Sequence, residues 1–292
     1  MKPPISRSLQ QEIAVWRART GHLSANWSGT IQGNASVAGL PRLASAVRRL
    51  AAMRDHCLFY GLLAALGLTC LSWSLLAGLL HRLLPRRLGE PLGQRAIMLI
   101  FRGLLGAMQV TGVCRASFGA LDALAAAGPL VVAPNHPSLL DAVLIIARLP
   151  NVVCAAKAEI WDNPFLGGGA RLAGFIRNDS PARLIREAVR RVRAGRHFLI
   201  FPEGTRTNGG SIGGFKGGFA LIAKQAGVPV QTVFIETNSR FLGKGWPLFR
   251  KPPFPLVYRA RVGERITVEG SLRDTVRRLG AYYRQELGVR EP

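Results

Sequence analysis

The 24 residues from Cys57 to Leu80 contain no charged side chain. As a helix with a rise of about 1.5 Å per residue, a run of this length can cross a bilayer core of about 30 Å. Arginines stand on both sides of the run, so the distribution of positive charge gives no direction of insertion. The run therefore predicts a membrane-associated helix, and the alternative is a buried helix of a soluble domain.

Two neighbouring segments extend this prediction. From Leu40 to Met53 apolar residues recur at roughly helical spacing beside arginines, which suits a basic amphipathic helix on an anionic membrane, although a solvated charged face fits nearly as well. From Ala96 to Cys114 the chain is again apolar, but Arg102 interrupts it and is costly at mid-bilayer unless it is paired or reaches the interface. We expect residues 41–111 to form amphipathic and apolar helices that dip into one leaflet or, alternatively, span the membrane.

The first 40 residues are rich in Ser, Gly, Gln and Asn, lack a sustained apolar period and are predicted to be a disordered basic tail. No secretory signal is expected, because the first long apolar run begins only at Cys57 and no small-residue cleavage site is evident. We expect the rest of the chain to lie on the cytoplasmic face of a bacterial inner membrane.

The formal net charge is +23 at pH 7, and 48% of the residues are hydrophobic. A strongly basic surface attracts polyanions such as anionic lipid, an acidic protein or nucleic acid. Nucleic acid is not the expected partner, because no DNA- or RNA-binding module and no zinc-ligand spacing is recognisable. The four cysteines lie among apolar residues without a Cys-x-x-Cys pair, which favours buried thiols in a reducing compartment and predicts no metal site.

Residues 112–292 are predicted to form one α/β domain. Apolar runs of strand length alternate with helical patterns, which is typical of a mostly parallel sheet flanked by helices, with ligands at the loops that follow the strands. The expected strands are 130–133, 151–156, 197–201, 228–235, 256–260 and 265–269. The expected helices are 121–127, 138–147, 159–172 with a bend near its proline, 181–194, 215–225 and 271–287.

The first of these strands leads into a loop with a histidine and an aspartate. Val131, Val132 and Ala133 end a buried strand that delivers His136 into the loop, and Asp141 follows about one turn into the next helix. A histidine there can take a proton from a hydroxyl, since its ordinary pKa is near neutral, and the aspartate can fix its tautomer and orientation. The alternative is an ordinary loop histidine with a first-turn aspartate that the helix dipole stabilises.

A second apolar strand, Phe198 to Phe201, runs into the polar loop Pro202 to Thr207. With this pair of motifs, Asn-His-x4-Asp and Phe-Pro-Glu-Gly-Thr-Arg, the sequence resembles the glycerolipid acyltransferase family that includes bacterial 1-acylglycerol-3-phosphate acyltransferases. The resemblance covers about residues 112–268. It implies a glycerol-3-phosphate acyltransferase-like α/β fold and acyl transfer from a thioester, which requires neither a metal nor a cofactor.

The resemblance also implies an acceptor site. The loop residues Glu203, Gly204, Thr205 and Arg206 would contribute to it, and the planar guanidinium of Arg206 suits a phosphate or carboxylate. Lys216 lies in the family's Phe-Lys-x-Gly element at a helix start, where the helix dipole favours anions. By itself a lysine at a helix start usually has no chemical role.

The family's second motif region departs from the pattern. Members that form phosphatidic acid place an arginine for the acceptor phosphate in a Gly-x-Ile-x-x-x-Arg-like stretch, and here that position is Ser180. Arg177 or Arg183 would have to replace it, and the alternative is that Arg177 only faces solvent. Lys157, which matches a lysine common just before this segment, is a candidate for donor or headgroup binding, or only a capping residue.

The sequence thus predicts a membrane-associated O-acyltransferase. The resemblance implies that His136, oriented by Asp141, moves a fatty acyl chain from an acyl-carrier-protein or coenzyme A thioester to a lysolipid hydroxyl, without a covalent acyl-enzyme. Lysophosphatidic acid is the default acceptor, and the missing arginine makes another lipid, such as a lyso-ornithine, polyene or secondary-metabolite lipid, the first alternative. A thioester hydrolase, which a Gly-x-Ser-x-Gly elbow would have indicated, and a non-enzymatic membrane-binding protein are further alternatives.

Overall fold

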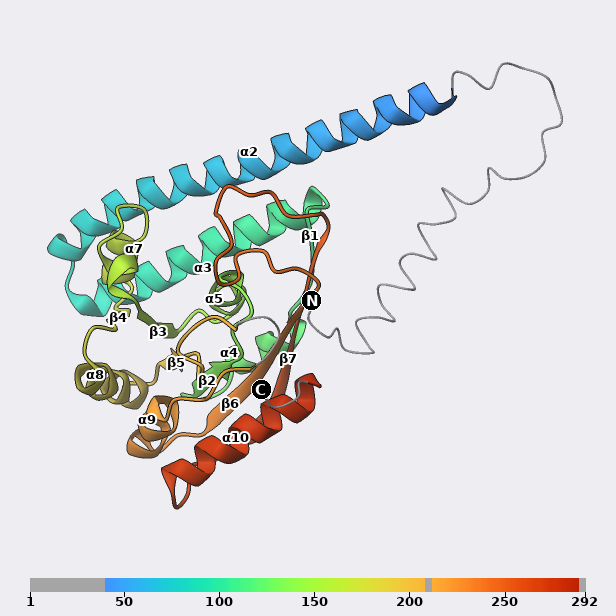
Figure 1. Cartoon of the computed structure of the whole chain (residues 1–292). Helices are drawn as coiled ribbons and strands as arrows, with labels where there is room; N and C mark the ends of the chain where they lie inside the picture. Colours follow the sequence, from blue (N-terminus) through green and yellow to red (C-terminus); the bar gives the residue numbers. More distant parts are fainter. Residues whose placement is uncertain (1–39, 208–211, 289–292) are drawn as a thin grey trace.

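A seven-stranded sheet forms the centre of the computed structural model, which describes residues 40–207 and 212–288 (Figure 1). The strands are ordered β1-β7-β6-β2-β5-β3-β4, and every neighbouring pair is parallel except β6 and β7. The strands are β1 (Cys114–Ser117), β2 (Val131–Pro134), β3 (Val152–Ala156), β4 (Ile176–Arg177), β5 (His197–Leu199), β6 (Val230–Thr237) and β7 (Leu256–Ile266). The predicted disordered tail lies outside the described residues, apart from its last residue.

Helices cover both faces of this sheet (Figure 1). One layer consists of α2 (Leu40–Leu83), α3 (Arg86–Val110), α5 (Leu140–Ile146) and α7 (Gly167–Leu172). The other layer consists of α8 (Pro181–Arg193), α9 (Gly218–Ala226) and α10 (Leu272–Leu287). The short helices η2 (Gly119–Leu121), α4 (Asp122–Ala125) and α6 (Ala158–Trp161) lie in connections.

The central strands are apolar on both sides because both faces are covered. In β2, Val131 and Ala133 pack with the α8–α10 layer, Val132 packs with the opposite layer, and all three are buried. Continuous apolar runs of this kind are typical of parallel strands. The prediction of a mostly parallel sheet flanked by helices is confirmed.

Helix α2 is a single helix of 44 residues. The predicted amphipathic helix Leu40–Met53 is therefore the first part of the long helix, because no glycine or proline separates it from the apolar run that follows. The second part of α2 packs on α7, where the amide of Gly168 donates to Oγ of Ser74 at 2.9 Å. A side chain at Gly168 would collide with the carbonyl of Ser74, so glycine permits this close approach. The first part of α2 extends beyond the rest of the fold (Figure 1).

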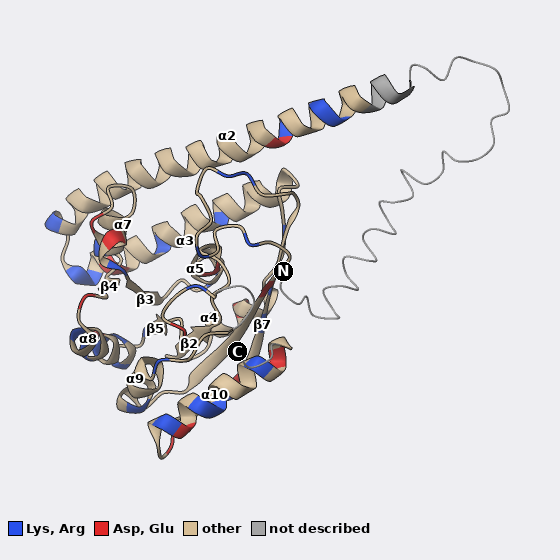
Figure 2. Cartoon of the chain, viewed as in Figure 1, with Lys and Arg blue, Asp and Glu red and all other residues tan. Residues whose placement is uncertain are grey.

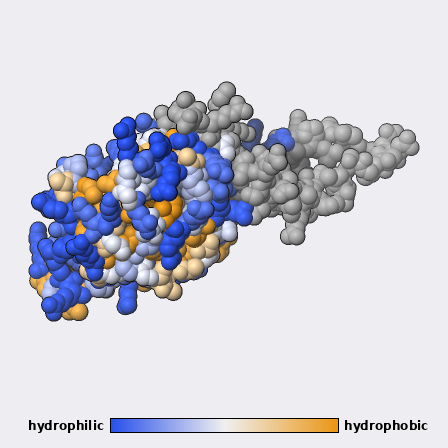
Figure 3. All heavy atoms as spheres, turned by 90° about the horizontal axis from the view of Figure 1, so that it is seen from below, coloured by the Kyte–Doolittle hydropathy of each residue, from blue (hydrophilic) through white to orange (hydrophobic). Residues whose placement is uncertain are grey.

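Among the described residues, α2 is the one helix that is long and apolar enough to cross a membrane. Its candidate span is Ser45–Leu83, and only 17% of the most apolar window is buried. Most of α2 carries no charge, whereas charged residues are frequent on α8 and α10 (Figure 2). When the molecule is viewed from below relative to Figure 1, the visible surface is mostly hydrophilic (Figure 3). The second apolar stretch forms much of α3, where Nε of Arg102 donates to the carbonyl of Ala147 at 2.6 Å. Arg102 is thus hydrogen-bonded to a backbone carbonyl of the α/β domain.

Near the carboxyl end, the prediction of two strands at 256–260 and 265–269 is wrong. The structure has one strand, β7, which pairs in parallel with β1 and antiparallel with β6. Gly263 and Glu264 interrupt the apolar alternation near the end of β7, and this interruption divided the strand in the sequence pattern. The last helix follows as expected, with Oγ of Ser271 accepting from the amide of Asp274 at its start.

Candidate active site

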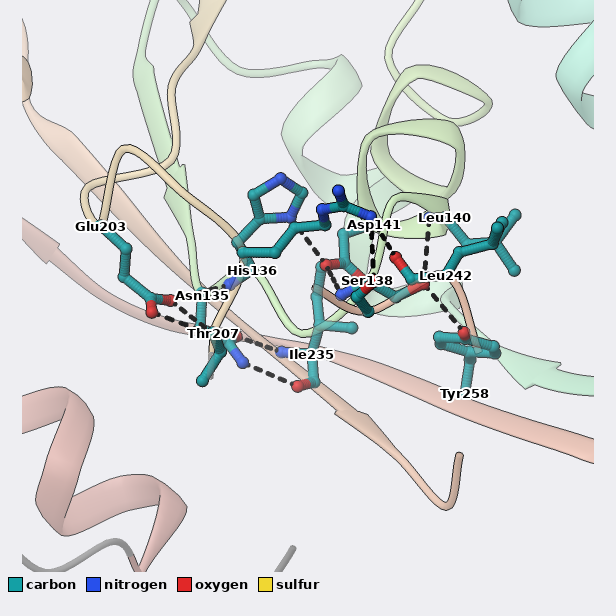
Figure 4. A network of polar contacts seen from close by, with 12 residues as sticks. Asn135, His136, Ser138, Leu140, Asp141, Glu203, Thr207, Ile235, Leu242 and Tyr258 are labelled. Atoms are coloured by element: carbon teal, nitrogen blue, oxygen red, sulfur yellow. Dashed lines mark hydrogen bonds and ion pairs between the residues drawn. The ribbon is translucent and has the colours of Figure 1, made fainter. Parts of the chain in front are cut away.

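The two motif loops leave the same edge of the sheet, because β2 and β5 are parallel neighbours. The loop after β2 carries His136, and the loop after β5 carries Glu203 (Figure 4). The exit from β2 is fixed by Asn135, whose Nδ2 donates to the carbonyl of Ile235 at 2.9 Å and whose Oδ1 accepts from the amide of Ile235 at 2.7 Å.

His136 and Asp141 form a hydrogen-bonded pair. Nδ1 of His136 lies 3.0 Å from Oδ2 of Asp141, and the same oxygen accepts from the amide of Ser138 at 2.6 Å. Asp141 is fully buried, and its Oδ1 has no hydrogen-bond partner among the described residues. Burial raises the pKa of Asp141 to about 6, although the hydrogen bond from His136 acts in the opposite direction. With a carboxylate as its neighbour, Nδ1 carries the proton, which leaves Nε2 as the basic nitrogen.

The imidazole ring is held from a second side by Phe201. The two rings stack with centroids 3.7 Å apart and planes 14° apart. The His136 side chain keeps 13% of its surface exposed, and its Nε2 has no hydrogen-bond partner within the described residues. The ring is therefore fixed in position, and no residue in the described part of the chain occupies its basic nitrogen.

Glu203 lies beneath His136, with 3% of its surface exposed (Figure 4). Its Oε1 accepts from the amide of His136 at 3.0 Å. The hydroxyl of Thr207 donates to both carboxylate oxygens, at 2.9 and 3.0 Å, and the amide of Gly213 donates to Oε2 at 3.3 Å. These donors occupy the carboxylate, so Glu203 ties the two loops together.

Arg206 also bonds to the protein itself. Its Nη1 donates to the carbonyls of Leu242 and Gly243 at 2.8 and 3.0 Å, so the guanidinium connects the loop after β5 with the loop after β6. Thr205, the neighbouring candidate, is exposed.

Gly204 and Lys216 lie together at the same edge of the sheet. Gly204 has a φ of +67°, a region that favours glycine, and a Cβ there would stand 2.9 Å from the Lys216 side chain. The Lys216 side chain is exposed, and its amide donates to the carbonyl of Pro202 at 2.8 Å. The glycine thus gives the lysine room to lie across the loop.

The two candidates from the second motif region lie farther along the sheet. Arg177 is paired with Asp162 at 3.1 Å and with Asp179 at 3.0 Å, so two carboxylates partly neutralise its charge. Lys157 is exposed and stands directly before α6, at the end of β3. In the sheet β5 separates β3 from β2, and β4 lies on the far side of β3. The structure therefore does not bring Arg177 next to His136.

Ser138 and Tyr258 are parts of the site that the sequence prediction omitted. The fully buried Ser138 donates from Oγ to the carbonyl of Phe241 at 2.9 Å and accepts from the hydroxyl of Tyr258 at 3.2 Å. Burial raises the pKa of Tyr258 well beyond its ordinary value, so the phenol stays a neutral donor. Ser138 lies two residues after His136, so the sequence could have indicated it as part of the site. Tyr258 lies 120 residues from Ser138, and no local pattern connects the two.

Phe201 and Thr207 were also omitted, although both adjoin the second motif. A lone aromatic residue at a strand end and a lone threonine in a loop usually have structural roles, and only their contacts with His136 and Glu203 distinguish them. Among the described residues no group of three or more His, Cys, Asp or Glu side chains is arranged to hold a metal ion.

A family model described as Acyltransferase matches residues 115–236, which include both motif loops. The lyso-ornithine lipid O-acyltransferase of Pseudomonas aeruginosa is 41% identical over 112 residues, which are 37% of this chain and 43% of that protein. The 1-acyl-sn-glycerol-3-phosphate acyltransferase of Helicobacter pylori is 31% identical over 159 residues, which are 52% of this chain and 62% of that protein. The matches thus span less than two thirds of either relative.

The fold is also found in a solved structure. The crystal structure of the 1-acyl-sn-glycerophosphate acyltransferase PlsC from Thermotoga maritima superposes with a TM-score of 0.62. The superposition covers 84% of this chain and 99% of that chain, at 22% sequence identity. The likeness therefore includes helices outside the segment that the family model matches, and at this identity it concerns the fold alone.

Proposed function

We propose, from the match of residues 115–236 to the acyltransferase family model, that this protein transfers a fatty acyl chain from a thioester to the hydroxyl of a lysolipid. The observation that carries the proposal is the pairing of His136 with the buried Asp141, which leaves one ring nitrogen open at the edge of the sheet. A hydroxyl is a poor nucleophile until a base removes its proton, and general-base catalysis contributes about 10²–10⁴-fold.

In the proposed reaction, Nε2 of His136 takes the proton of the acceptor hydroxyl while its oxygen forms a bond to the thioester carbon. Asp141 stabilises the positive charge that then develops on the ring. The tetrahedral intermediate collapses, the carbon–sulfur bond breaks, and the imidazolium returns the proton to the leaving thiol. No acyl group is attached to the protein at any step, and neither a metal nor a cofactor takes part.

The thioester is proposed to be carried by acyl-carrier protein or coenzyme A. Both are anionic, and the chain has a net charge of +23, so its surface attracts either donor. On this basis the rate of transfer at low donor concentration should fall as salt is added, because exposed charges are screened.

Lysophosphatidic acid is the proposed acceptor, with exposed Lys157 and Lys216 and the loop Glu203–Arg206 as candidate contacts. A lyso-ornithine lipid is the second candidate, and one observation favours it. The position of the family's phosphate-binding arginine is Ser180, and the nearby Arg177 is engaged by two aspartates. An acceptor without a phosphate needs no cation at that place.

A serine hydrolase mechanism has little support from the site. Ser138, the serine nearest the histidine in sequence, is fully buried, and its hydroxyl is bonded to the carbonyl of Phe241. Hydrolysis by a water that His136 activates is the remaining hydrolytic alternative, and it is tested directly below.

We also propose that the protein works at the cytoplasmic face of a bacterial inner membrane. The exposed apolar helix α2 supports membrane association, and a long-chain lysolipid is itself a membrane component. A membrane-binding protein without activity would need α2 and the positive charge, but not the His136–Asp141 pair.

The deciding experiment measures thiol release from an acyl-thioester with no acceptor, with lysophosphatidic acid and with lyso-ornithine lipid. Wild type is compared with His136→Ala and with His81→Ala, a control at an exposed histidine near the end of α2. Acceptor-dependent release that disappears only in His136→Ala supports the proposal, and the better acceptor identifies the lipid. Acceptor-independent release indicates a hydrolase. No release from any donor, or equal release by wild type and His136→Ala, contradicts the mechanism.

A further inference from the structure

The connection between β6 and β7, residues 238–255, has an exposed apolar tip. We call this segment the β6–β7 loop. Leu248 is 48% exposed and Phe249 is 69% exposed, whereas the other large apolar side chains of the loop are at least partly covered. Two adjacent large apolar side chains in water lose hydrophobic stabilisation unless a partner covers them. The tip therefore indicates a contact surface.

The outward position of the tip is fixed by bonds within the loop. Nε1 of Trp246 donates to the carbonyl of Arg250 at 3.0 Å, and the amide of Arg250 donates to the carbonyl of Pro247 at the same distance. The guanidinium of Arg250 also lies 5.1 Å from the centre of the Trp246 ring. These contacts join residues on both sides of the tip. The backbone of Leu248 and Phe249 is therefore held in a defined turn.

The charges of the β6–β7 loop itself are all of one sign. The β6–β7 loop contains two arginines and two lysines and no aspartate or glutamate (Figure 2). Lys244 and Arg250 are exposed. Apolar side chains beside tryptophan and cationic residues are the composition found where proteins meet the interface of an anionic membrane. The charge thus favours an anionic lipid surface as the partner.

The tip adjoins the candidate membrane helix. The hydroxyl of Tyr60 in α2 donates to the carbonyl of Phe249 at 3.1 Å, and Tyr60 is itself 45% exposed. Beside it, the ring of Phe59 packs edge-on against Phe241 with centroids 5.9 Å apart. The loop and α2 therefore form one continuous surface (Figure 1).

The base of the loop is bonded to both catalytic motif loops. The carbonyl of Phe241 accepts from the hydroxyl of Ser138, and the carbonyl of Leu242 accepts from the amide of Leu139 at 3.1 Å and from Arg206 at 2.8 Å. The position of the loop is thus tied to the backbone that carries the catalytic histidine.

From these contacts we infer that Leu248 and Phe249 insert into the headgroup region of an anionic phospholipid bilayer beside α2. The β6–β7 loop is then a second membrane contact, and it holds the His136 edge of the sheet against the lipid surface from which the acceptor comes. The inference deepens the proposed function and rests on it for the membrane-borne acceptor. A protein partner would explain an apolar tip, but not its continuity with α2.

The first test measures depth and needs no activity. The full chain with Cys57→Ser and Phe249→Cys carries an environment-sensitive fluorophore at position 249, and the matched control carries it at Arg278→Cys on α10, in the opposite helix layer. Vesicles of phosphatidylglycerol and phosphatidylcholine should shift the emission at 249 to shorter wavelength, and shallowly brominated lipids should quench it, with neither effect at 278. A label at 249 that stays in water, or equal quenching at both sites, overturns the inference.

The second test measures coupling to the reaction. Leu248→Ser/Phe249→Ser and Lys244→Glu should each lower kcat/KM roughly tenfold for a long-chain lysolipid in anionic vesicles, and Arg278→Glu should not. The rate with a short-chain monomeric acceptor should stay unchanged, because that acceptor needs no bilayer. Equal losses on both acceptors would show that the loop acts on folding or chemistry, which contradicts the membrane role. If wild type transfers no acyl group at all, the proposed function fails while the depth measurement still decides the position of the loop.

Discussion

Two buried carboxylates bond to His136, the proposed general base, and they have different roles. Asp141 is fully buried and bonds to the imidazole ring at 3.0 Å. Glu203 is almost as deeply buried, but it bonds to the backbone amide of His136 and to Thr207. One carboxylate sets the tautomer and direction of the ring, and the other sets the position of the loop that carries it.

A carboxylate in a recognisable motif therefore does not necessarily contact the substrate. Asp141 makes one side-chain hydrogen bond, to the imidazole of His136, and one of its oxygens has no hydrogen-bond partner in the described structure. The oxygens of Glu203 are taken up by three donors from two loops. We therefore expect loss of Asp141 to affect the chemistry and loss of Glu203 to affect mainly the stability of the site.

The largest expected effect comes from Asp141→Asn, which should lower kcat by about 10²–10³-fold because the amide no longer selects the tautomer with a basic Nε2. The measurement is steady-state thiol release, with circular dichroism to verify the fold. The KM for the acceptor should change little. A variant with near-normal kcat would mean that Asp141 is only structural, and the comparison with Glu203 would fail.

The next effect is a dependence of kcat and of stability on pH, which comes from the protonation of Asp141. Burial raises the pKa of Asp141 to about 6, so kcat should fall as the pH drops through about 6 and the group becomes neutral. The folded state binds this proton more tightly than the unfolded state, whose pKa is near 3.8, and so Asp141 makes the protein less stable as pH rises from about 4 to 6. Denaturant titrations of wild type should show this slope, and Asp141→Asn should lack its contribution.

For the second carboxylate, Glu203→Gln should reduce the free energy of unfolding by about 1–3 kcal/mol, because charge-assisted hydrogen bonds from buried donors are weakened. The kcat should fall only about tenfold, through the displaced amide of His136. Thermal unfolding and thiol release measured on the same sample separate the two quantities. A loss of kcat as large as that of Asp141→Asn, without a loss of stability, would assign Glu203 to the substrate.

The smallest expected effect is that of Gly204→Ala in the loop that Glu203 holds. The φ of +67° disfavours any other residue by about 1 kcal/mol, and the new Cβ would stand 2.9 Å from the Lys216 side chain. A flexible lysine can move aside, so we expect a small loss of stability and a higher KM for an anionic acceptor. Lys216→Met at the same site is the control. If Gly204→Ala raises KM and Lys216→Met does not, the lysine does not contact the acceptor.

For the apolar N-terminal region, the sequence predicted a helix but not its full length. The uncharged run was found in α2, yet the helix begins 17 residues earlier than the run, at Leu40 rather than Cys57. Helical propensity alone does not mark the end of one helix and the start of another where no breaking residue stands between them. The division of β7 into two strands was the opposite error, because Gly263 and Glu264 interrupt the apolar alternation of one continuous strand.

The parts of the site that lie close together in the sequence could be predicted from the sequence alone. His136 and Asp141 are five residues apart, and the turn between the strand and the helix brings them together. The parallel order of β2 and β5 was also foreseeable, because two-sided apolar strands alternate with helices. These features follow from backbone geometry and from the period of apolar residues.

Which polar groups remain unbonded within the protein, and so available to a substrate, depends on the tertiary structure. Arg206 bonds to carbonyls 36 and 37 residues away, and Tyr258 reaches Ser138 across 120 residues. Arg177 has the charge that a phosphate requires, but two aspartates engage it. Such pairings depend on how loops and strands pack in three dimensions. A local motif gives the chemical nature of each side chain but not the partner that occupies it.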